Sequence, residues 1–278
     1  MFPILPSIKG FIEIALNEDI QIGDITTNAI IEEDSISVVN VIAREDIILC
    51  GGDIFKEVFL FLNQSIRFQE RCRDGDKVSC GEVIMELSGD TRSLLIGERV
   101  GLNILQRLSG IATLTAKYVE LIEGYKAEII DTRKTMPLWR GMERYAVRCG
   151  GGKNHRSGLS GGVLIKDNHI RAVGSIKGAI ERVKRNLTRM VKIEVEVGDL
   201  KEVEDALEAG AEIIMLDNMS ISEIKKAVRL INGRVPVEVS GNIDMESIVE
   251  VAKTGVDYIS VGSLTHSASA VDISMEMG

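Results

Sequence analysis

Ile193-Glu194-Val195-Glu196-Val197 is a short run rich in β-branched residues, followed by an amphipathic helical pattern at 200–210 and a second apolar run, Ile213-Ile214-Met215-Leu216. The helical pattern ends at Gly210, a residue type that commonly terminates helices. The same alternation continues through the second half of the chain. Because a crossover helix returns the chain to the same end of a sheet, this register predicts parallel strands.

The repeated register indicates an α/β barrel, and an open doubly wound sheet is the alternative architecture. A dinucleotide-binding sheet is disfavoured, because no Gly-x-Gly-x-x-Gly motif opens a first strand-helix turn. Strands are predicted at 128–130, 163–165, 193–197, 213–216, 237–239 and 258–261, and helices at 176–187, 200–210, 221–233 and 245–255.

The N-terminal part has a different pattern. A helix is predicted at about 8–17, β-rich sequence at 35–87 and a long helix at 93–123. Gly110 lies inside the long helical pattern, and we expect it to break or bend the helix. This part of the chain is therefore predicted to be a sheet domain.

Composition and charge exclude several classes of protein. The chain has 278 residues, 45% of them hydrophobic, which is too apolar for a disordered protein. Its formal net charge is −9, which disfavours a general nucleic-acid role. The N-terminal residues show neither a signal peptide nor a membrane span, so we expect a cytoplasmic protein. Cys50, Cys72, Cys80 and Cys149 are scattered without a Cys-x-x-Cys spacing, so neither a zinc site nor a disulfide framework is indicated.

Polar side chains follow the predicted strands, at the edge where α/β barrels hold their active sites. Asp131-Thr132-Arg133-Lys134 follow the strand at 128–130, and Lys166-Asp167 follow the strand at 163–165. Between them, Gly150-Gly151-Gly152-Lys153-Asn154-His155-Arg156 adds further cations. A solvated basic face is the commoner fate of such charges, but here they alternate with Gly, Thr, Asn and His. We therefore predict a positive pocket for a small anion on an acidic protein.

The residue types at this edge suggest three kinds of contact. Arg133 and Arg156 offer planar forks that suit carboxylates, and His155 could donate to a carboxylate. Lys134 and Lys166 are point charges that suit phosphate oxygens. Carboxylates at strand ends could hold Mg²⁺ or ribose hydroxyls, and glycine-serine turns could cradle a phosphate through backbone N–H groups. These groups are Glu196, Asp217, Ser240, Gly241, Gly262 and Ser263.

At these residues the chain resembles the quinolinate phosphoribosyltransferase family, also called nicotinate-nucleotide pyrophosphorylase. The matching motifs cover nearly the full length of the sequence. They are Glu18-Asp19, Gly23-Asp24-Ile25-Thr26-Thr27, Glu98-Arg99, residues 103–113, 131–135, 145–147, 150–156, 164–169, 194–197 and 216–218, Ser240-Gly241-Asn242 and residues 261–267.

The resemblance implies an α/β fold with two domains. These are an N-terminal α/β sandwich at 1–108 and a TIM-like, incomplete α/β barrel at 109–278, whose last few residues can return to the first domain. The implied reaction is phosphoribosyl transfer from phosphoribosyl pyrophosphate to quinolinate with decarboxylation, giving nicotinate mononucleotide, pyrophosphate and CO₂ in de novo NAD biosynthesis. A homodimer or a hexamer of dimers is implied, with Arg99 contributed across the interface. No nucleic-acid or membrane partner is expected.

The family's site residues carry over by their positions in the motifs. Catalytic roles are implied for Lys134, Lys166, Glu196 and Asp217, and the two carboxylates would bind Mg²⁺ directly or indirectly. Substrate-binding roles are implied for Arg99, Thr132, Arg133, His155, Arg156, Ser240, Gly241, Asn242, Val261, Gly262 and Ser263.

Two loops depart from the family pattern, at 136–140 and 160–162, which puts loop packing and substrate affinity in question. Two other functions therefore stay open. One is a pyrophosphorylase-like paralogue associated with molybdenum transport that acts on another substrate. The other is a binding scaffold that has lost activity.

Overall fold

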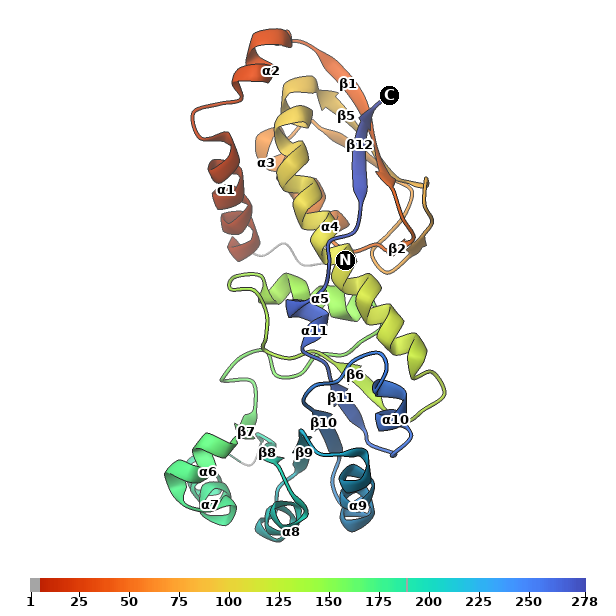
Figure 1. Cartoon of the computed structure of the whole chain (residues 1–278). Helices are drawn as coiled ribbons and strands as arrows, with labels where there is room; N and C mark the ends of the chain where they lie inside the picture. Colours follow the sequence, from red (N-terminus) through yellow and green to blue (C-terminus); the bar gives the residue numbers. More distant parts are fainter. Residues whose placement is uncertain (1–5, 189) are drawn as a thin grey trace. The chain divides into compact units, whose positions relative to one another are not determined.

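A computed structural model describes the chain except for residues 1–5 and 189 (Figure 1). The chain forms two compact units, each made of segments that are distant in sequence. The first contains the residues up to Ala116 together with Met136–Gly151 and Ser267–Gly278, and the second contains Lys117–Thr135 and Gly152–His266. The boundary expected at 108/109 lies inside a single helix, α4 (Thr91–Leu121).

The first unit is built on an antiparallel sheet with the strand order β12-β1-β5-β3. A short antiparallel pair, β2-β4, belongs to the same unit. The strands are β1 (Ile36–Ala43), β2 (Ile47–Ile48), β3 (Arg67–Glu70), β4 (Lys77–Val78), β5 (Val83–Asp90) and β12 (Ile273–Met277). The helices are α1 (Pro6–Ile20), α2 (Ile25–Ile30), α3 (Gly52–Leu62), α5 (Arg140–Cys149) and most of α4.

Two glycines allow α3 and α4 to pack closely. Phe55 and Phe59 lie one turn apart on α3 and are fully buried. A Cβ atom at Gly97 would lie 2.8 Å from the Phe59 ring, and one at Gly101 would lie 3.0 Å from the Phe55 ring. The helix α3 falls in the region expected to be β-rich, so that expectation is corrected: apolar residues at helical spacing bury this segment against α4.

The helix α4 is not broken at Gly110. A Cβ atom at Gly110 would lie only 2.0 Å from the backbone oxygen of Ser269. The glycine therefore serves a close backbone approach. The predicted break is wrong, and the alternative of a bend stays a prediction.

The second unit is a six-stranded sheet in the order β6-β11-β10-β9-β8-β7, in which every pairing between neighbours is parallel. This confirms the predicted register. Among the described residues, β6 and β7 do not form a ladder with each other, so the sheet is not closed. The strands are β6 (Glu128–Ile130), β7 (Val163–Ile165), β8 (Ile193–Val197), β9 (Ile213–Asp217), β10 (Val237–Ser240) and β11 (Tyr258–Ser260).

Helices follow these strands, and α7, α8 and α9 lie in a row outside them (Figure 1). They are α6 (Asp167–Val173), α7 (Ile176–Asn186), α8 (Leu200–Ala209), α9 (Ile221–Ile231), α10 (Ile248–Ala252) and α11 (Ser263–His266). The helix α9 starts at a capping box formed by Ser220 and Glu223. The helix α10 is shorter than predicted, because the Asp244 side chain accepts from the backbone N–H groups of Glu246 and Ser247 and holds them in a turn.

The strands β8, β9 and β10 are buried along most of their length, as expected for parallel strands covered by helices. Near their carboxyl ends, Glu196, Asp217 and Ser240 are partly exposed. The carboxyl ends of these strands are therefore accessible to solvent. In the described part of the chain, no helix has the length and apolar character needed to cross a membrane.

Candidate active site

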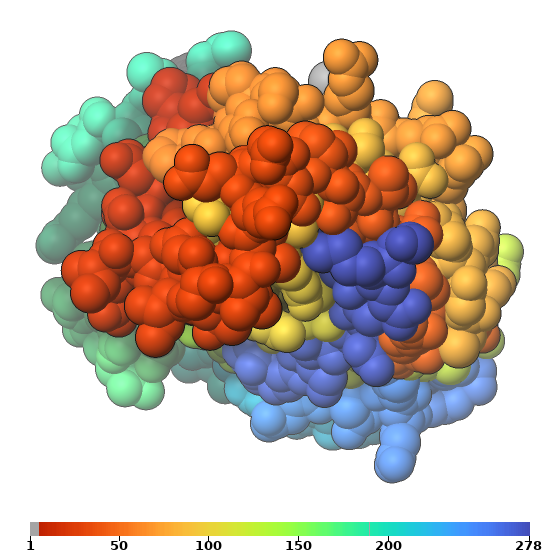
Figure 2. Space-filling view, turned by 90° about the horizontal axis from the view of Figure 1, so that it is seen from above, coloured from red at the N-terminus to blue at the C-terminus, as the bar shows by residue number. Residues whose placement is uncertain are grey.

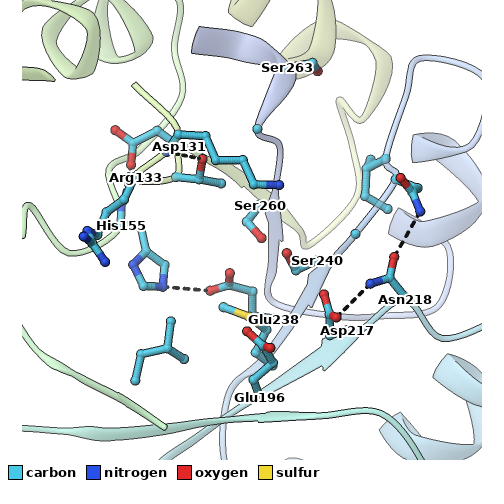
Figure 3. Close-up of a pocket in the computed structure, with 18 of the residues that line it drawn as sticks. Asp131, Arg133, His155, Glu196, Asp217, Asn218, Glu238, Ser240, Ser260 and Ser263 are labelled. Carbon is cyan, nitrogen blue, oxygen red and sulfur yellow. Dashed lines mark hydrogen bonds and ion pairs between the residues drawn. The ribbon is translucent and has the colours of Figure 1, made fainter. Parts of the chain in front are cut away.

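A cavity of about 900 Å³ lies at the carboxyl ends of the parallel strands (Figure 3). This is the edge at which the sequence predicted a site. Most predicted site residues line the cavity, namely Thr132, Arg133, Lys134, His155, Arg156, Lys166, Glu196, Asp217, Ser240, Gly241, Asn242, Gly262 and Ser263. Two do not: Arg99 is exposed on α4, and the Val261 side chain is buried.

A buried carboxylate fixes the glycine-rich loop to β6. Asp131 is fully buried; one of its oxygens accepts the backbone N–H of His155 at 2.7 Å, and the other accepts the side-chain amide of Asn154 at 2.7 Å. Lys153 and Ile130 add a parallel bridge. The loop that carries His155 is therefore held by strand-like pairing and by Asp131. Sequence reasoning assigned no role to Asp131, although its position directly after a buried strand marked it.

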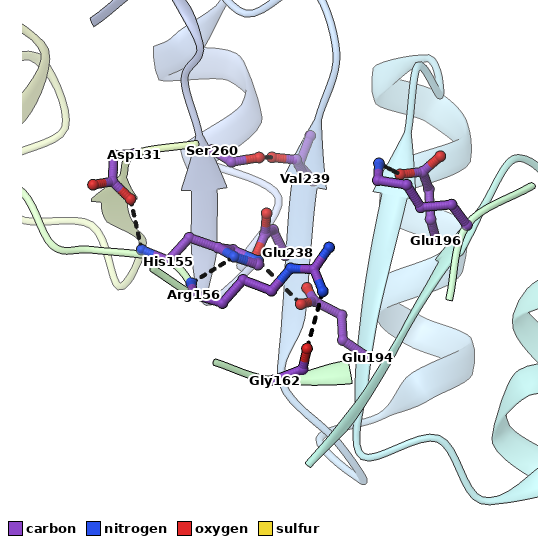
Figure 4. A network of polar contacts seen from close by, with 10 residues as sticks. Asp131, His155, Arg156, Gly162, Glu194, Glu196, Glu238, Val239 and Ser260 are labelled. Carbon is purple, nitrogen blue, oxygen red and sulfur yellow. Dashed lines mark hydrogen bonds and ion pairs between the residues drawn. The ribbon is translucent and has the colours of Figure 1, made fainter. Parts of the chain in front are cut away.

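The floor of the cavity is formed by His155 and Glu238, which line it, and by the buried Glu194, which contacts His155 (Figure 4). His155 Nε2 lies 3.0 Å from an oxygen of Glu194 and 3.6 Å from an oxygen of Glu238. The other ring nitrogen, Nδ1, accepts the backbone N–H of Arg156 at 2.7 Å. That hydrogen bond requires an unprotonated Nδ1, so the ring proton resides on Nε2 and faces the glutamates. Both ring nitrogens of His155 thus have protein partners, and a substrate carboxylate would have to replace one of them.

Burial shifts the pKa of Glu238 upward. Its side chain is almost completely buried, and this burial raises the pKa of Glu238 well above its usual value. The neighbouring Glu194 raises the pKa further, whereas the Ser260 hydroxyl and the charge of Lys166 lower it. Two glutamates can therefore share the floor without two full negative charges. Neither was singled out from the sequence, where they read as members of strands.

Two arginines place positive charge above this floor. Arg156 Nη1 donates to the carbonyl of Gly162 at 2.9 Å. Burial lowers the pKa of Arg156, as does the positive charge of Arg133, while Glu194 opposes both effects. A guanidinium remains charged at neutral pH, so both arginines are cations. An anion bound between them would relieve the repulsion that they exert on each other.

Two lysines are positioned by their backbone and by neighbours. Lys166 forms an ion pair with Glu196, and its backbone N–H donates to His169 Nδ1 at 2.9 Å. The backbone N–H of Lys134 donates to the Thr132 hydroxyl at 3.1 Å. The Lys134 carbonyl accepts from the Thr265 hydroxyl at 2.6 Å. These contacts fix the peptide of Lys134 while its side chain stays exposed to the cavity.

Asn218 lies across the cavity from Arg133 and His155 (Figure 3). Asn218 donates to the Asp217 carboxylate at 2.7 Å and accepts from the Asn242 side chain at 3.1 Å. Gly241 has a φ of +98°, and a Cβ atom there would lie 2.3 Å from the Asn218 side-chain oxygen. Only glycine fits this turn. Asn218 links the loops after β9 and β10, a role that its place in the sequence did not reveal.

Two groups of carboxylates could hold a cation, one buried and one partly exposed. His155, Glu194 and Glu238 each place one donor atom within 4.8 Å of the others, but the two glutamates are buried and already contact the histidine. Glu196 and Asp217 are partly exposed at the cavity wall. Because Mg²⁺ binds through one or two carboxylates and keeps several waters, Glu196 and Asp217 fit it better.

Models of one protein family match most of the chain. The model described as quinolinate phosphoribosyl transferase, N-terminal domain, matches residues 24–109, and the C-terminal domain model matches residues 111–276. The curated quinolinate phosphoribosyltransferase (decarboxylating) 1b of Nicotiana tabacum is 40% identical over 289 residues. The alignment covers 97% of this chain and 82% of the tobacco protein.

Solved structures share the fold over nearly the full length. The nicotinate-nucleotide pyrophosphorylase of Francisella tularensis superposes with a TM-score of 0.95 at 45% identity, covering 99% of this chain and 98% of that one. NadC of Streptococcus pyogenes superposes with a TM-score of 0.96 at 44% identity, with the same coverage. These matches confirm the expected fold class and favour the resemblance over the molybdenum-associated alternative. The chain belongs to the quinolinate phosphoribosyltransferase family.

Proposed function

We propose that this chain transfers the phosphoribosyl group of phosphoribosyl pyrophosphate to quinolinate, with loss of pyrophosphate and CO₂. One observation carries the proposal. On a protein with a formal net charge of −9, cations gather on one cavity that also presents two partly exposed carboxylates. Such a cavity concentrates small anions and can stabilise positive charge that develops on a sugar. A cytoplasmic location stays a prediction from the sequence.

The two arginines are the proposed binding site for the pyridine diacid. Arg133 and Arg156 both line the cavity, and their charges act on each other. Each guanidinium can bind a carboxylate with two parallel hydrogen bonds. His155 would act mainly by shaping this pocket, because Asp131 holds its peptide and Glu194 holds its ring.

The phosphoribosyl pyrophosphate would lie along the lysines and the glycine-serine turns. Lys134 and Lys166 are suited to pyrophosphate oxygens as point charges. The turns at Ser240-Gly241 and Gly262-Ser263 line the same cavity and offer backbone N–H groups to the 5′-phosphate. The Gly241 turn is the better defined of the two, because Asn218 fills the space beside it.

Mg²⁺ is the proposed cofactor, held by Glu196 and Asp217. The contacts of these residues with Lys166 and Asn218 use one oxygen of each carboxylate. The donor set is made of oxygen and is partly exposed, as Mg²⁺ requires. When bound, the cation would offset negative charge on the leaving pyrophosphate.

In the proposed reaction, the pyridine nitrogen attacks C1 of the ribose as its bond to pyrophosphate breaks. Positive charge builds up at the ribosyl centre, and the carboxylates of Glu196 and Asp217 stabilise it. The resulting pyridinium withdraws electrons from the ring, so the bond to the 2-carboxylate breaks, CO₂ leaves and the ring carbon takes a proton. Arginine contacts hold that carboxylate in place until it leaves. Neither step requires a covalent bond to the protein.

We further propose a homodimer, or a hexamer of dimers, in which Arg99 enters the cavity of a neighbouring subunit. Arg99 is exposed on α4 and does not line the cavity of its own chain. Mixing Arg99→Ala protein with a variant inactivated at Arg133 tests this directly. Partial recovery of turnover supports a shared site, whereas no recovery despite mixed assembly contradicts it.

Release of labelled CO₂ from quinolinate labelled in its 2-carboxylate tests the reaction. We expect release only when phosphoribosyl pyrophosphate is present, with one nicotinate mononucleotide formed for each CO₂. Transfer to a different base without CO₂ release would favour a paralogue with another substrate. Binding of both substrates without turnover would favour a scaffold, and either result would overturn the proposal.

A further inference from the structure

A second cluster of side chains that could bind a metal ion belongs to the first unit, whereas the cavity is lined by residues of the second unit. Cys50, Asp74 and Cys149 each place one donor atom within 4.8 Å of the others. Cys50 precedes α3, Asp74 lies between β3 and β4, and Cys149 is the last residue of α5. Because these residues are so far apart in the sequence, cysteine spacing does not reveal the cluster.

The Asp74 carboxylate is held in one orientation. One oxygen accepts the backbone N–H groups of Gly51 and Gly52 at 3.0 and 2.9 Å, and the other accepts the Tyr145 hydroxyl at 2.8 Å. Gly51 has a φ of +104°, and a Cβ atom at Gly52 would lie 3.3 Å from the carboxylate. The two glycines therefore let the backbone wrap around Asp74. Partners of this kind commonly orient metal-binding carboxylates.

The backbone of Cys50 is held as firmly. Its N–H donates to the Ser109 hydroxyl at 3.0 Å, and its carbonyl accepts from that hydroxyl at 3.2 Å. Cys50 is fully buried, whereas Cys149 is partly exposed at the end of α5. The cluster is thus fully buried at Cys50 and partly accessible to solvent at Cys149.

The two thiols interact with each other. The hydrogen bond from Cys50 lowers the pKa of Cys149, and burial raises the pKa of Cys50. Asp74 opposes ionisation of both thiols, while Arg148 favours it. The three donor atoms converge on one small volume. A bound divalent cation would displace the thiol protons and offset the negative charge of two thiolates and a carboxylate.

We propose that Cys50, Asp74 and Cys149 form a Zn²⁺ site with three protein ligands that stabilises the first unit. Two thiolates select a borderline-soft cation over Mg²⁺, which prefers oxygen ligands. Binding replaces the two thiol protons by two sulfur–zinc bonds and releases both protons to solvent. Water supplies the fourth ligand, and Tyr145 remains a hydrogen-bond donor to the Asp74 carboxylate. The cation would pin the end of α5 to the segment before α3.

Cobalt is the probe, because Co²⁺ bound to thiolates gives a charge-transfer band in the near ultraviolet that Co²⁺ bound to carboxylates lacks. The reduced, metal-free full chain is titrated with Co²⁺, and Zn²⁺ is then added. We expect a band that saturates at one equivalent and disappears when Zn²⁺ displaces the cobalt. The affinity should fall at lower pH, because protons compete for the thiolates.

Variants locate the band. Cys50→Ser and Cys149→Ser should each abolish it, and Tyr145→Phe should weaken affinity by about tenfold or more, as expected when a ligand loses its partner. Cys80→Ser is the matched control, since Cys80 is exposed and its thiol donates to the Arg44 carbonyl. A Cys72→Ser/Cys80→Ser double variant retains only Cys50 and Cys149, so its band must come from that pair.

Thermal unfolding gives a second readout. Zn²⁺ should raise the Tm of the parent and of Cys80→Ser but leave that of Cys149→Ser unchanged. The proposal is overturned if no thiolate band appears with excess cobalt, or if the band survives loss of both Cys50 and Cys149. It is also overturned if the parent pair has become a disulfide under reducing conditions, seen as two missing hydrogens in the intact mass.

Discussion

The rim and the floor of the cavity use charge in opposite ways. Rim side chains such as Arg133, Lys134 and Asp217 are exposed or partly exposed, and they remain available to a ligand. In the floor, Glu194 and Glu238 are buried, and the partly exposed His155 lies between them. The floor side chains thus find most of their contacts within the protein, although one buried oxygen of each glutamate has no hydrogen-bond partner, whereas the rim side chains remain available to a ligand.

This difference predicts which property each substitution changes. A rim charge is solvated in the free protein, so its removal should reduce turnover with little effect on stability. A floor charge is desolvated, so its removal should alter the free energy of unfolding as well. The four predictions below test that division, beginning with the largest expected effect.

Arg133→Ala and Arg156→Ala should each lower kcat/KM for quinolinate by roughly 30-fold to several thousand-fold. The expected loss is about 2–5 kcal/mol, because each change strips a partner from a bound carboxylate. Initial rates of labelled CO₂ release measure it, and urea unfolding shows whether the fold survives. Arg171→Ala is the matched control, since Arg171 is exposed on α6 and pairs with Asp167. Turnover near the parent rate in either cavity variant would show that the arginine assignment is wrong.

Glu194→Gln should destabilise the protein more than Glu238→Gln. Glu194 accepts from His155 at 3.0 Å, and loss of a charged hydrogen-bond acceptor costs about 1.5–3 kcal/mol. Glutamine resembles the protonated acid that burial favours at Glu238, so the second change should cost less. Urea unfolding at neutral pH compares the two. Equal losses of stability would contradict the proposed difference between the two glutamates.

Gly241→Ala should raise KM for phosphoribosyl pyrophosphate and cost about 1–3 kcal/mol of stability through backbone strain. The new methyl group would also collide with the Asn218 side chain. Gly255→Ala is a matched control, because Gly255 has a φ of +87° but nothing within 4 Å of the added atom. Steady-state kinetics should show the KM effect for Gly241→Ala alone. An equal change in KM in both variants would show that the turn at Gly241 does not bind the phosphate.

The pH dependence of stability should reveal the proton on Glu238. Its raised folded pKa means that its contribution to stability is fully present below its usual value of 4.5 and is lost as pH rises through the folded value. Glu238→Gln lacks this dependence. The stability of the parent relative to Glu238→Gln should therefore fall with rising pH, by at most about 1.4 kcal/mol per pH unit. The prediction fails if the difference in free energy of unfolding between the parent and Glu238→Gln stays constant in urea titrations from about pH 5 to 8.

The rim was predictable from the sequence, and the floor was not. Lys166, Asp217 and Ser240 directly follow or end an apolar run, so their place at the strand ends follows from the parallel register. Glu194 and Glu238 lie inside apolar runs, where alternation alone does not say whether a charge faces the barrel interior or the helices. Their partner His155 comes from a loop, and only the folded chain brings the three together.

The first unit was less predictable for a related reason. Phe55 and Phe59 have helical spacing, but the strands on either side of α3 dominate the local pattern. The effect of Gly110 depends on Ser269, which is distant in the sequence. Cys50 and Cys149 likewise meet only through tertiary structure. Local sequence patterns predict most helices and strands. They do not predict features that depend on contacts between distant segments, such as the uninterrupted helix at Gly110 or the cysteine cluster.

The pairing of β12 with β1 has a consequence for synthesis on the ribosome. Residues 39–43 pair with residues 273–277, so the sheet of the first unit lacks one strand until residues 273–277 have emerged. Nascent chains fold domain by domain, and an unpaired strand edge invites aggregation. The sheet of the first unit is therefore completed only after the second unit has been translated, and its β1 edge stays unpaired until then.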